Sequence, residues 1–277
     1  MEKILDTLKQ TGFDFKKKFG QNFITDTNLL DAIVLDAEID SQDEVLEIGT
    51  GAGTLTKAIA KKCKKVVSLE IDNSLREYLY SAFNDYSNIN LFFADFMKVS
   101  PQEVNKQFDG AFKVVANLPY YITTPIITRL IKEKYNVKSI TIMVQKEVAD
   151  RLVSESGTKD YGAITVWLDS IADVKLKRIV NKKMFTPMPK VDSAIVSISL
   201  NRKKYNIKNY PLHEKVIESA FSMRRKTLVN CLKAKLSLSQ EQIEKVFDQI
   251  GLHIGVRGEV LSTEQFVALS NAICDLY

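Results

Sequence analysis

The 277-residue sequence predicts an α/β protein: a mostly parallel, doubly wound sheet followed by a small α-helical domain. Three observations support this fold class. Short apolar runs alternate with helical patterns as far as about Val153. Several of these runs end on an acidic or amide side chain, and open α/β sheets bind their ligands at that edge. After residues 201–204 the alternation stops, and helical patterns follow.

The elements follow from local patterns. In residues 28–37 the apolar side chains recur with helical spacing, whereas the strand candidates are short runs rich in Val, Ile and Phe. The expected strands are residues 45–48, 66–70, 89–93, 111–116, 139–144, 165–168, 174–176 and 194–200. The expected C-terminal helices are residues 214–235, 240–251 and 263–276. We therefore expect one domain over 1–204, beginning with a basic arm, and a helical domain over 205–277.

Composition narrows the class of protein. The chain is 45% hydrophobic and 26% charged, as in a soluble globular protein, and no apolar run approaches the ~20 residues of a membrane span. Cys63, Cys231 and Cys274 are isolated, which indicates a reducing cytoplasm rather than a disulfide framework. His213 and His253 lie far apart and beside no cysteine, so we expect no metal and no Ser- or Cys-based triad.

Charge is distributed unevenly along the chain. Residues 175–235 contain sixteen Lys and Arg against three acids, a net of +13, so the remaining residues carry about −8 of the total +5. A long stretch of one sign is the electrostatic pattern expected for a nucleic-acid partner, because each neutralised phosphate releases counterions. We expect a nucleic acid rather than a membrane as the partner.

Asn117-Leu118-Pro119-Tyr120 follows the apolar run at 111–116 and is the most informative motif. Proline holds Leu118 in the extended region, so the direction of its carbonyl is set in advance. An amide oxygen and a carbonyl beside an aromatic ring suit a flat heterocycle with an exocyclic NH2, and adenine is the obvious candidate. Accepting two hydrogen bonds from that NH2 favours its nucleophilic form as charge develops.

A second motif is a strand followed by Gly49, Gly51 and Gly53, then a helix. Glycines there let a ligand lie against the backbone at a helix N-terminus. Glu70 ends the next strand. In dinucleotide-binding folds a carboxylate at this position binds the hydroxyl groups of a ribose. The Gly-x-Gly-x-Gly spacing differs from that of NAD sites. The rim expected at this edge of the sheet comprises Glu47, Glu70, Asp95 and Asn117.

The glycine loop, Glu70, residues 94–96 and residues 117–120 resemble the ordered motifs of S-adenosylmethionine (SAM) dependent N6-adenine methyltransferases. Residues 18–23 are similar to the N-terminal signature of the ribosomal RNA adenine dimethylases. Further segments resemble the bacterial small-subunit branch of that family, and the resemblance runs from about Phe15 to Leu269: these segments are residues 157–163, 185–194, 221–228 and 257–266. Thr50 and Met223 stand where the family more often has Pro and Gln.

The resemblance implies a Rossmann-like methyltransferase domain with a seven-stranded sheet, and SAM as methyl donor. It implies dimethylation of N6 at two adjacent adenosines in the 3′-terminal hairpin loop of 16S rRNA, within the immature 30S subunit. The implied cofactor-binding residues are Asn22, Ile24, Gly49, Gly51, Glu70, Asp95 and Asn117. The implied catalytic residues are Asn117, Leu118, Tyr120 and Phe185. The implied RNA-binding residues are Lys190, Arg224, Arg225 and Lys226.

Three alternatives remain at this point. A 23S rRNA methyltransferase of the macrolide-resistance type shares the glycine loop and the Asn117 motif, but the segments at 221–228 and 257–266 argue against it. A DNA adenine methyltransferase usually has Pro where this chain has Leu118. A ribosome-assembly factor that only docks on the small subunit would use the same basic stretch. We expect a cytoplasmic monomer.

Overall fold

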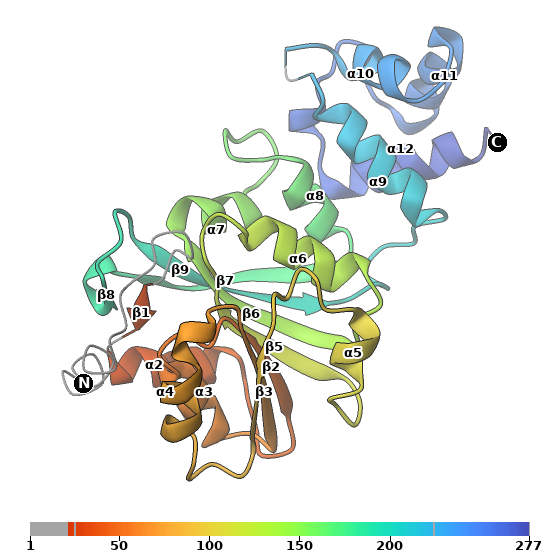
Figure 1. Cartoon of the computed structure of the whole chain (residues 1–277). Coiled ribbons are helices and arrows are strands. Elements are labelled where there is room, and N and C mark those ends of the chain that lie inside the picture. Colours follow the sequence, from red (N-terminus) through yellow and green to blue (C-terminus); the bar gives the residue numbers. More distant parts are fainter. Residues whose placement is uncertain (1–21, 25, 224, 277) are drawn as a thin grey trace. The chain divides into compact units, whose positions relative to one another are not determined.

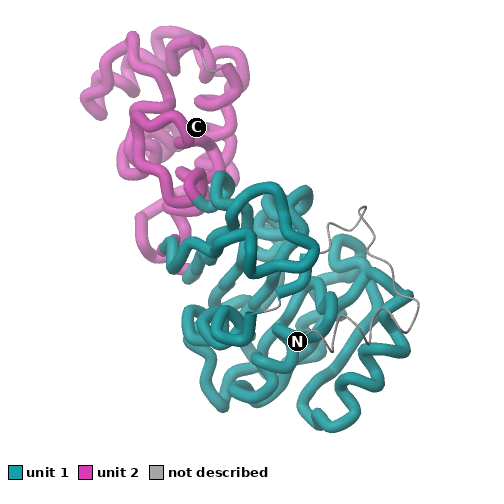
Figure 2. The backbone as a smooth tube through the Cα atoms, turned by 90° about the vertical axis from the view of Figure 1, so that its left-hand side faces the viewer, with its two compact units in different colours: residues 1–149, 175–199 teal, residues 150–174, 200–277 magenta. Residues whose placement is uncertain are grey.

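The computed structural model describes residues 22–24, 26–223 and 225–276 (Figure 1). Two compact units divide the chain: residues 1–149 with 175–199, and residues 150–174 with 200–277 (Figure 2). Residues 150–174, which we expected in the first domain, thus group with the C-terminal helices. That residues 1–204 and 205–277 are separate domains stays a prediction.

The first unit is built on a mostly parallel sheet of seven strands in the described chain, in the order β4-β3-β2-β5-β6-β9-β7. Its strands are β2 (Glu44–Ile48), β3 (Lys65–Glu70), β4 (Ile89–Phe93), β5 (Phe112–Asn117), β6 (Val137–Gln145), β7 (Ala172–Val180) and β9 (Ser193–Leu200). The pairings from β4 through β6 are parallel, and β9 runs antiparallel to β6. The predicted Rossmann-like fold class and its seven-stranded sheet are confirmed.

Helices cover both faces of this sheet. On one side lie α2 (Thr27–Asp36), α3 (Thr54–Ala60) and α4 (Arg76–Ala82), and on the other α5 (Pro101–Asn105) and α6 (Thr123–Lys132) (Figure 1). The short 3-10 helix η2 (Asn73–Leu75) leads into α4, and α7 (Lys146–Leu152) follows β6. Connections of this kind let neighbouring strands run in the same direction.

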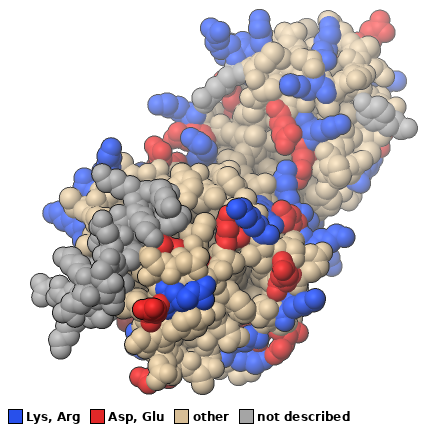
Figure 3. Space-filling view, in the orientation of Figure 1, with Lys and Arg blue, Asp and Glu red and all other residues tan. Residues whose placement is uncertain are grey.

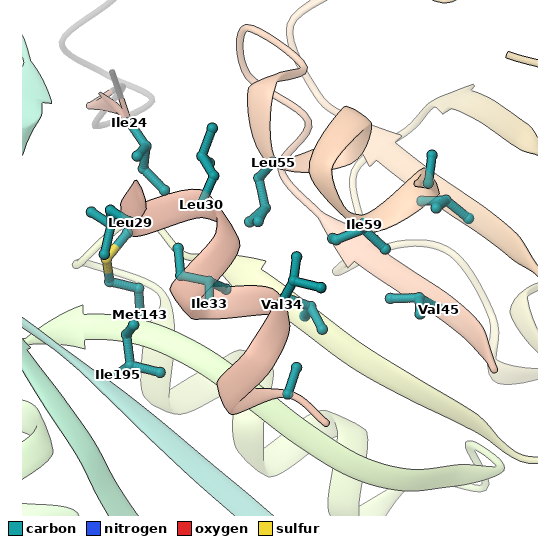
Figure 4. Packing of buried hydrophobic residues seen from close by; sticks show 14 of the residues in the cluster. Ile24, Leu29, Leu30, Ile33, Val34, Val45, Leu55, Ile59, Met143 and Ile195 are labelled. Atoms are coloured by element: carbon teal, nitrogen blue, oxygen red, sulfur yellow. The ribbon is translucent and has the colours of Figure 1, made fainter. Parts of the chain in front are cut away.

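The core of the first unit fills the space between these helices and the sheet. Helix α2 begins at a capped end, where the Asp26 Oδ1 accepts a hydrogen bond of 2.9 Å from the Leu29 N–H. Its buried face then points toward α3 and the sheet (Figure 4). The labelled side chains there are Ile24, Leu29, Leu30, Ile33, Val34, Val45, Leu55, Ile59, Met143 and Ile195. Burying each such side chain contributes about 1.5–3 kcal/mol, which fixes α2 and α3 on the sheet.

A separate two-stranded ribbon brings distant segments together. β1 (Phe23–Ile24) pairs antiparallel with β8 (Phe185–Thr186), with Phe23 opposite Thr186 and Ile24 opposite Phe185. The 3-10 helix η3 (Lys182–Met184) precedes β8. The ribbon therefore joins the described start of the chain to the segment between β7 and β9.

The second unit is helical, and it corrects one expected strand. Its helices are α8 (Ala163–Asp169), α9 (Tyr210–Ala220), α10 (Leu228–Lys235), α11 (Gln240–Ile250), η4 (Gly258–Val260) and α12 (Thr263–Cys274). Residues 165–168 lie in α8, so the predicted strand was wrong. Four apolar residues are too few for periodicity to separate a strand from a buried helix. Here Trp167 packs among the helices and its Nε1 donates to Glu214 at 2.8 Å.

The helix expected over 214–235 is two helices. α9 ends at Ala220 and α10 begins at Leu228. The Phe221 ring lies 5.8 Å from the Phe266 ring, and the Leu228 N–H donates to the Val256 carbonyl at 2.7 Å. These contacts with distant parts of the chain interrupt a helical pattern that is locally continuous. In the part of the chain that the structure describes, no helix is long and apolar enough to cross a membrane.

His213 of α9 gives the second unit a pH dependence. The side chain is buried, its Nδ1 lies 2.8 Å from the Ser270 Oγ, and its Nε2 has no hydrogen-bond partner among the described residues. Burial lowers the pKa of His213 from 6.5 to about 4. A lowered folded-state pKa means that stability is complete above pH 6.5 and is lost as the pH falls toward 4.

We predict that the unfolding free energy of the wild type falls when the pH is lowered from 7 to 4. The fall should be on the order of 3 kcal/mol larger than in His213→Gln, whose side chain does not titrate. Denaturant titrations followed by the fluorescence of Trp167, the one tryptophan in the chain, measure the second unit directly. A difference between the two proteins that does not change with pH would contradict this assignment.

Candidate functional site

The candidate site lies between β2 and β5, where the order of the strands in the sheet reverses. β2 and β5 are neighbours and run parallel, with Val45 opposite Lys113 and Glu47 opposite Val115. The loops that leave their carboxyl ends therefore start side by side. Gly49, with a φ of +86°, follows β2, and a Cβ added to it would lie 3.9 Å from the Asn117 carbonyl oxygen at the end of β5. In open α/β sheets this position is where ligands bind.

A pocket that is open to solvent occupies this position. Eight of the predicted site residues line it: Asn22, Ile24, Gly49, Gly51, Glu70, Asn117, Leu118 and Tyr120. The structure thus brings together residues from the N-terminal signature, the glycine loop, the end of β3 and the end of β5.

Glu70 ends β3 and holds the glycine loop. Its Oε2 accepts a hydrogen bond from the Gly51 N–H, and its Oε1 accepts one from the Asp72 N–H, both at 2.8 Å. Burial raises the pKa of Glu70, while these backbone donors act in the opposite direction. A carboxylate has about four lone-pair sites, so both oxygens can still accept from a ligand hydroxyl.

Asn117 is oriented by the start of the described chain. Its Nδ2 donates to the Asn22 carbonyl at 3.0 Å, which directs its Oδ1 elsewhere and keeps that oxygen as an acceptor. Leu118 is buried, and its N–H donates to the Met143 carbonyl at 3.4 Å. Because Pro119 follows, the backbone of Leu118 is held in the extended region, which fixes the direction of its carbonyl. Both residues line the pocket, so these two oxygens are candidate acceptors for a ligand there.

Tyr120 supplies an aromatic ring to the same pocket. Its Oη lies 2.9 Å from the Ser193 Oγ at the start of β9, and burial raises the pKa of the Tyr120 phenol. The hydroxyl therefore stays protonated near neutral pH and holds the ring in place. The turn itself is closed by the Ile122 N–H, which donates to the Pro119 carbonyl at 3.1 Å.

Two of the predicted catalytic and cofactor-binding residues do not line the pocket. Asp95 follows β4, and its Oδ1 accepts from the Met97 N–H at 3.0 Å. The adjacent Ala94 N–H donates to the Glu70 carbonyl, which brings this loop to the end of β3. Phe185 in β8 is 3% exposed and belongs to the core cluster with Met143 and Ile195. The roles implied for Asp95 and Phe185 stay predictions.

The predicted RNA-binding residues lie in both units. Lys190 of the first unit is exposed, as are Arg225 and Lys226 of the second, whereas Arg224 lies outside the described residues. On the face of the second unit in Figure 3, Lys and Arg side chains stand among Asp and Glu rather than in one continuous patch.

Several residues of the site were not among the predicted site residues. Ser193 positions Tyr120, and Thr54 donates through Oγ1 to the Ile24 carbonyl at 3.3 Å. Phe23 packs so close to Gly51 that a Cβ there would meet its ring at 3.1 Å. A serine or threonine next to a strand is common, and these contacts depend on pairing between segments far apart in the chain.

Glu47 is not on the rim where we expected it. Its side chain is fully buried in β2, and its Oε2 accepts from the Thr56 Oγ1 at 2.5 Å and from the Ser68 Oγ at 2.6 Å. Thr50 lies 2.6 Å from the same Ser68 hydroxyl. β2 lies inside the sheet between β3 and β5 and all five of its residues are buried, so Glu47 is buried as well. Burial raises the pKa of Glu47 to about 8.

Glu47 has a higher pKa in the folded state, so its contribution to stability is complete at pH values below its unfolded pKa near 4.5. This contribution is lost as the pH rises toward 8. We predict that Glu47→Gln, which keeps an amide oxygen for the two hydroxyls but does not titrate, gains stability relative to the wild type as the pH rises from 5 to 8. Thermal or chemical unfolding at the two pH values measures this change. A constant difference would show that Glu47 is not held protonated.

A family model described as "Ribosomal RNA adenine dimethylase" matches residues 12–275 of the chain. A relative from Clostridium acetobutylicum, "Ribosomal RNA small subunit methyltransferase A", is 45% identical over 96% of this chain and 96% of its own length. A relative of the same name from Bacillus cereus is 41% identical over 97% of this chain and 94% of its own length.

Two solved structures are also similar. A dimethyladenosine transferase from Plasmodium falciparum has a TM-score of 0.76 and 27% identity, over 89% of this chain and 95% of its own. The 23S rRNA methyltransferase ErmE has a TM-score of 0.72 and 26% identity, over 91% of this chain and 100% of its own. The matches with both proteins extend over most of the chain.

Proposed function

Because the chain belongs to the ribosomal RNA adenine dimethylase family, we propose that it dimethylates N6 of two adjacent adenosines in the 3′-terminal hairpin loop of 16S rRNA, with SAM as methyl donor. We further propose that it acts as a cytoplasmic monomer on the immature 30S subunit. Relatives named for the small subunit at 41–45% identity favour this substrate over the 23S rRNA of ErmE. The observation that carries the proposal is the pocket that joins the glycine loop to Asn117.

The residues present fit SAM. The positive φ angles of Gly49 and Gly51 open the loop for the methionine end of the cofactor, since a side chain at either position would be strained. The buried Glu70 carboxylate at the pocket suits two ribose hydroxyls, which would donate to it. Ile24 supplies an apolar wall. When bound, SAM supplies an electrophilic methyl group.

The acceptors at the end of β5 then activate the target base. The Asn117 Oδ1 and the Leu118 carbonyl accept hydrogen bonds from the two N6 hydrogens, which directs the nitrogen lone pair toward the methyl group. The Tyr120 ring stacks on the base and fixes its plane. Holding the two reactants in this alignment can supply about 7–11 kcal/mol of the barrier reduction.

The second transfer uses the same acceptors with one fewer donor. Once N6 carries a methyl group, a single hydrogen remains for two acceptors, so one of them loses its partner. The Asn117 oxygen is a side-chain atom and can adjust, whereas the Leu118 carbonyl is fixed by Pro119. We infer that the pocket has to admit the added carbon on the Asn117 side.

The target base has to leave its stack to reach this pocket, and a loop of single-stranded RNA costs least to open. We propose that Lys190 contacts that RNA. Its loop begins at β8, which pairs with the pocket-lining β1, and ends at Ser193, which contacts Tyr120. Between these anchors, Met188 and Val191 are exposed together with Lys190. A cationic and apolar loop of this kind suits phosphates and unstacked bases.

The proposal is tested by transfer of labelled methyl groups from SAM to small subunits that lack their dimethyladenosines. Large subunits and duplex DNA serve as parallel substrates, and the label is identified after nuclease digestion. We expect N6,N6-dimethyladenosine only in the small-subunit sample. Label in 23S rRNA would move the chain to the resistance type, and binding without any transfer would leave only a role in docking.

We predict that Asn117→Ala abolishes methyl transfer, because the side-chain acceptor for N6 is lost, while the dissociation constant for SAM stays within a few-fold of the wild type. Single-turnover transfer and calorimetric titration measure the two properties. Asn84→Ala, which removes an exposed amide, is the matched control and should behave as wild type. Near-normal turnover by Asn117→Ala would rule out the acceptor role.

For Glu70→Ala we predict a weaker affinity for SAM, at least tenfold, because both the ribose acceptor and the anchor of the Gly51 N–H are removed. The KM for SAM should rise correspondingly. Glu77→Ala removes an exposed carboxylate from α4 and serves as control. An unchanged affinity for SAM in Glu70→Ala would mean that the ribose lies elsewhere.

A further inference from the structure

Arg129 of α6 binds the loop that follows β4. Its side chain is only 12% exposed. The Nη1 donates to the Phe96 carbonyl at 2.7 Å, and the Nη2 donates to the Val99 carbonyl at 2.9 Å. Two backbone carbonyls three residues apart are thus held by a single guanidinium group. Charged donors of this kind make stronger hydrogen bonds than neutral ones.

Aromatic rings enclose the same guanidinium. It lies 5.5 Å from the centre of the Phe96 ring and 6.0 Å from that of Tyr135. The Tyr135 Oη also donates to the Val99 carbonyl, at 3.3 Å. At the outer side, the Arg129 Nε pairs with the partly exposed Glu133 at 3.0 Å. Several contacts therefore fix the Arg129 side chain, and two of them are hydrogen bonds to backbone carbonyls of the loop.

The segment held in this way is the loop that carries Asp95. The Lys98 and Val99 N–H groups donate to the Asp95 carbonyl at 2.8 and 3.2 Å, and the Asp95 Oδ1 accepts from the Met97 N–H. Asp95 thus forms one end of a turn whose other end is bound by Arg129. β4 is the edge strand of the seven-stranded sheet, so the described sheet gives the loop a neighbouring strand on one side only.

Helix α6 also begins at the other half of the site. The Thr123 Oγ1 and the Ile122 N–H both donate to the Pro119 carbonyl, immediately after Leu118. The same helix therefore starts at the acceptors for the target base and, at Arg129, holds the loop of Asp95. A helix is rigid over this length, so its two ends keep a fixed spacing.

We propose that Arg129 is a positioning residue for cofactor binding: it holds the loop 95–99 so that the Asp95 carboxylate meets the adenine amine of SAM. This inference rests on the proposed function and on the cofactor-binding role that the family resemblance implies for Asp95, which we take to be acceptance of a hydrogen bond from that amine. Arg129 itself does not contact the cofactor. Its loss should therefore weaken cofactor binding through Asp95 and leave the step at the Asn117 acceptors intact once SAM is saturating.

The test is the dissociation constant for S-adenosylhomocysteine, measured by calorimetry on folded Arg129→Gln and Arg129→Lys proteins. We expect about a tenfold weaker affinity for Arg129→Gln, equivalent to about 1.4 kcal/mol. Arg129→Lys, which keeps the charge but not the two-pronged geometry, should be intermediate. The KM for SAM should rise in parallel, while kcat stays within about threefold of wild type. Faster amide exchange at residues 96–99 without cofactor should accompany the loss.

Two further variants separate the possible outcomes. Glu133→Gln removes the outer ion pair and leaves both carbonyl bonds, so its affinity should match the wild type. Asp95→Ala combined with Arg129→Gln should bind no more weakly than Asp95→Ala alone, because both act through one contact. Additive losses, or wild-type affinity in folded Arg129→Gln, would overturn the inference. If Asp95→Ala alone binds normally, the proposed role of Asp95 is wrong, whatever Arg129 does.

Discussion

The parallel pairing of β2 with β5 is the constraint on which the rest of the site depends. It places the loop of Gly49 against the backbone of Asn117, at the point where the order of strands changes direction. The loop that we propose holds the cofactor and the loop that we propose holds the target base are thus parts of one edge and not of two separate surfaces. Side chains that would be ordinary loop residues in another order of strands, such as Glu70 and Tyr120, converge on a single pocket.

Buried polar groups keep this edge rigid. The Glu70 carboxylate accepts hydrogen bonds from the Gly51 and Asp72 N–H groups. The buried Glu47 carboxyl accepts hydrogen bonds from the Thr56 and Ser68 hydroxyls. Each of these groups costs free energy to bury, and hydrogen bonds offset that cost. A loop fixed in this way loses little conformational entropy when a ligand binds, so more of the binding energy is available for orienting the reactants.

Most of the sheet and half of the site follow from local sequence. The strands that end at Glu70 and Asn117 are apolar runs with a polar last residue, and parallel strands bring such residues to one edge. Local patterns failed where tertiary contacts decide. Residues 165–168 are too short a run to assign, and the break after Ala220 depends on Phe266. The bonds from Asn117 to Asn22 and from Tyr120 to Ser193 span 95 and 73 residues, so no local pattern indicates them.

The central claim is that one edge holds both the methyl donor and the target base, with Glu70 on the donor and Asn117 on the base. A crystal structure with bound S-adenosylhomocysteine tests it most directly. The account predicts that both ribose hydroxyls donate to Glu70 and that the sulfur faces the Asn117 Oδ1 and the Leu118 carbonyl, with room for a base between them. A cofactor whose ribose or adenine occupies the Asn117 acceptors, or one bound outside this pocket, would contradict it.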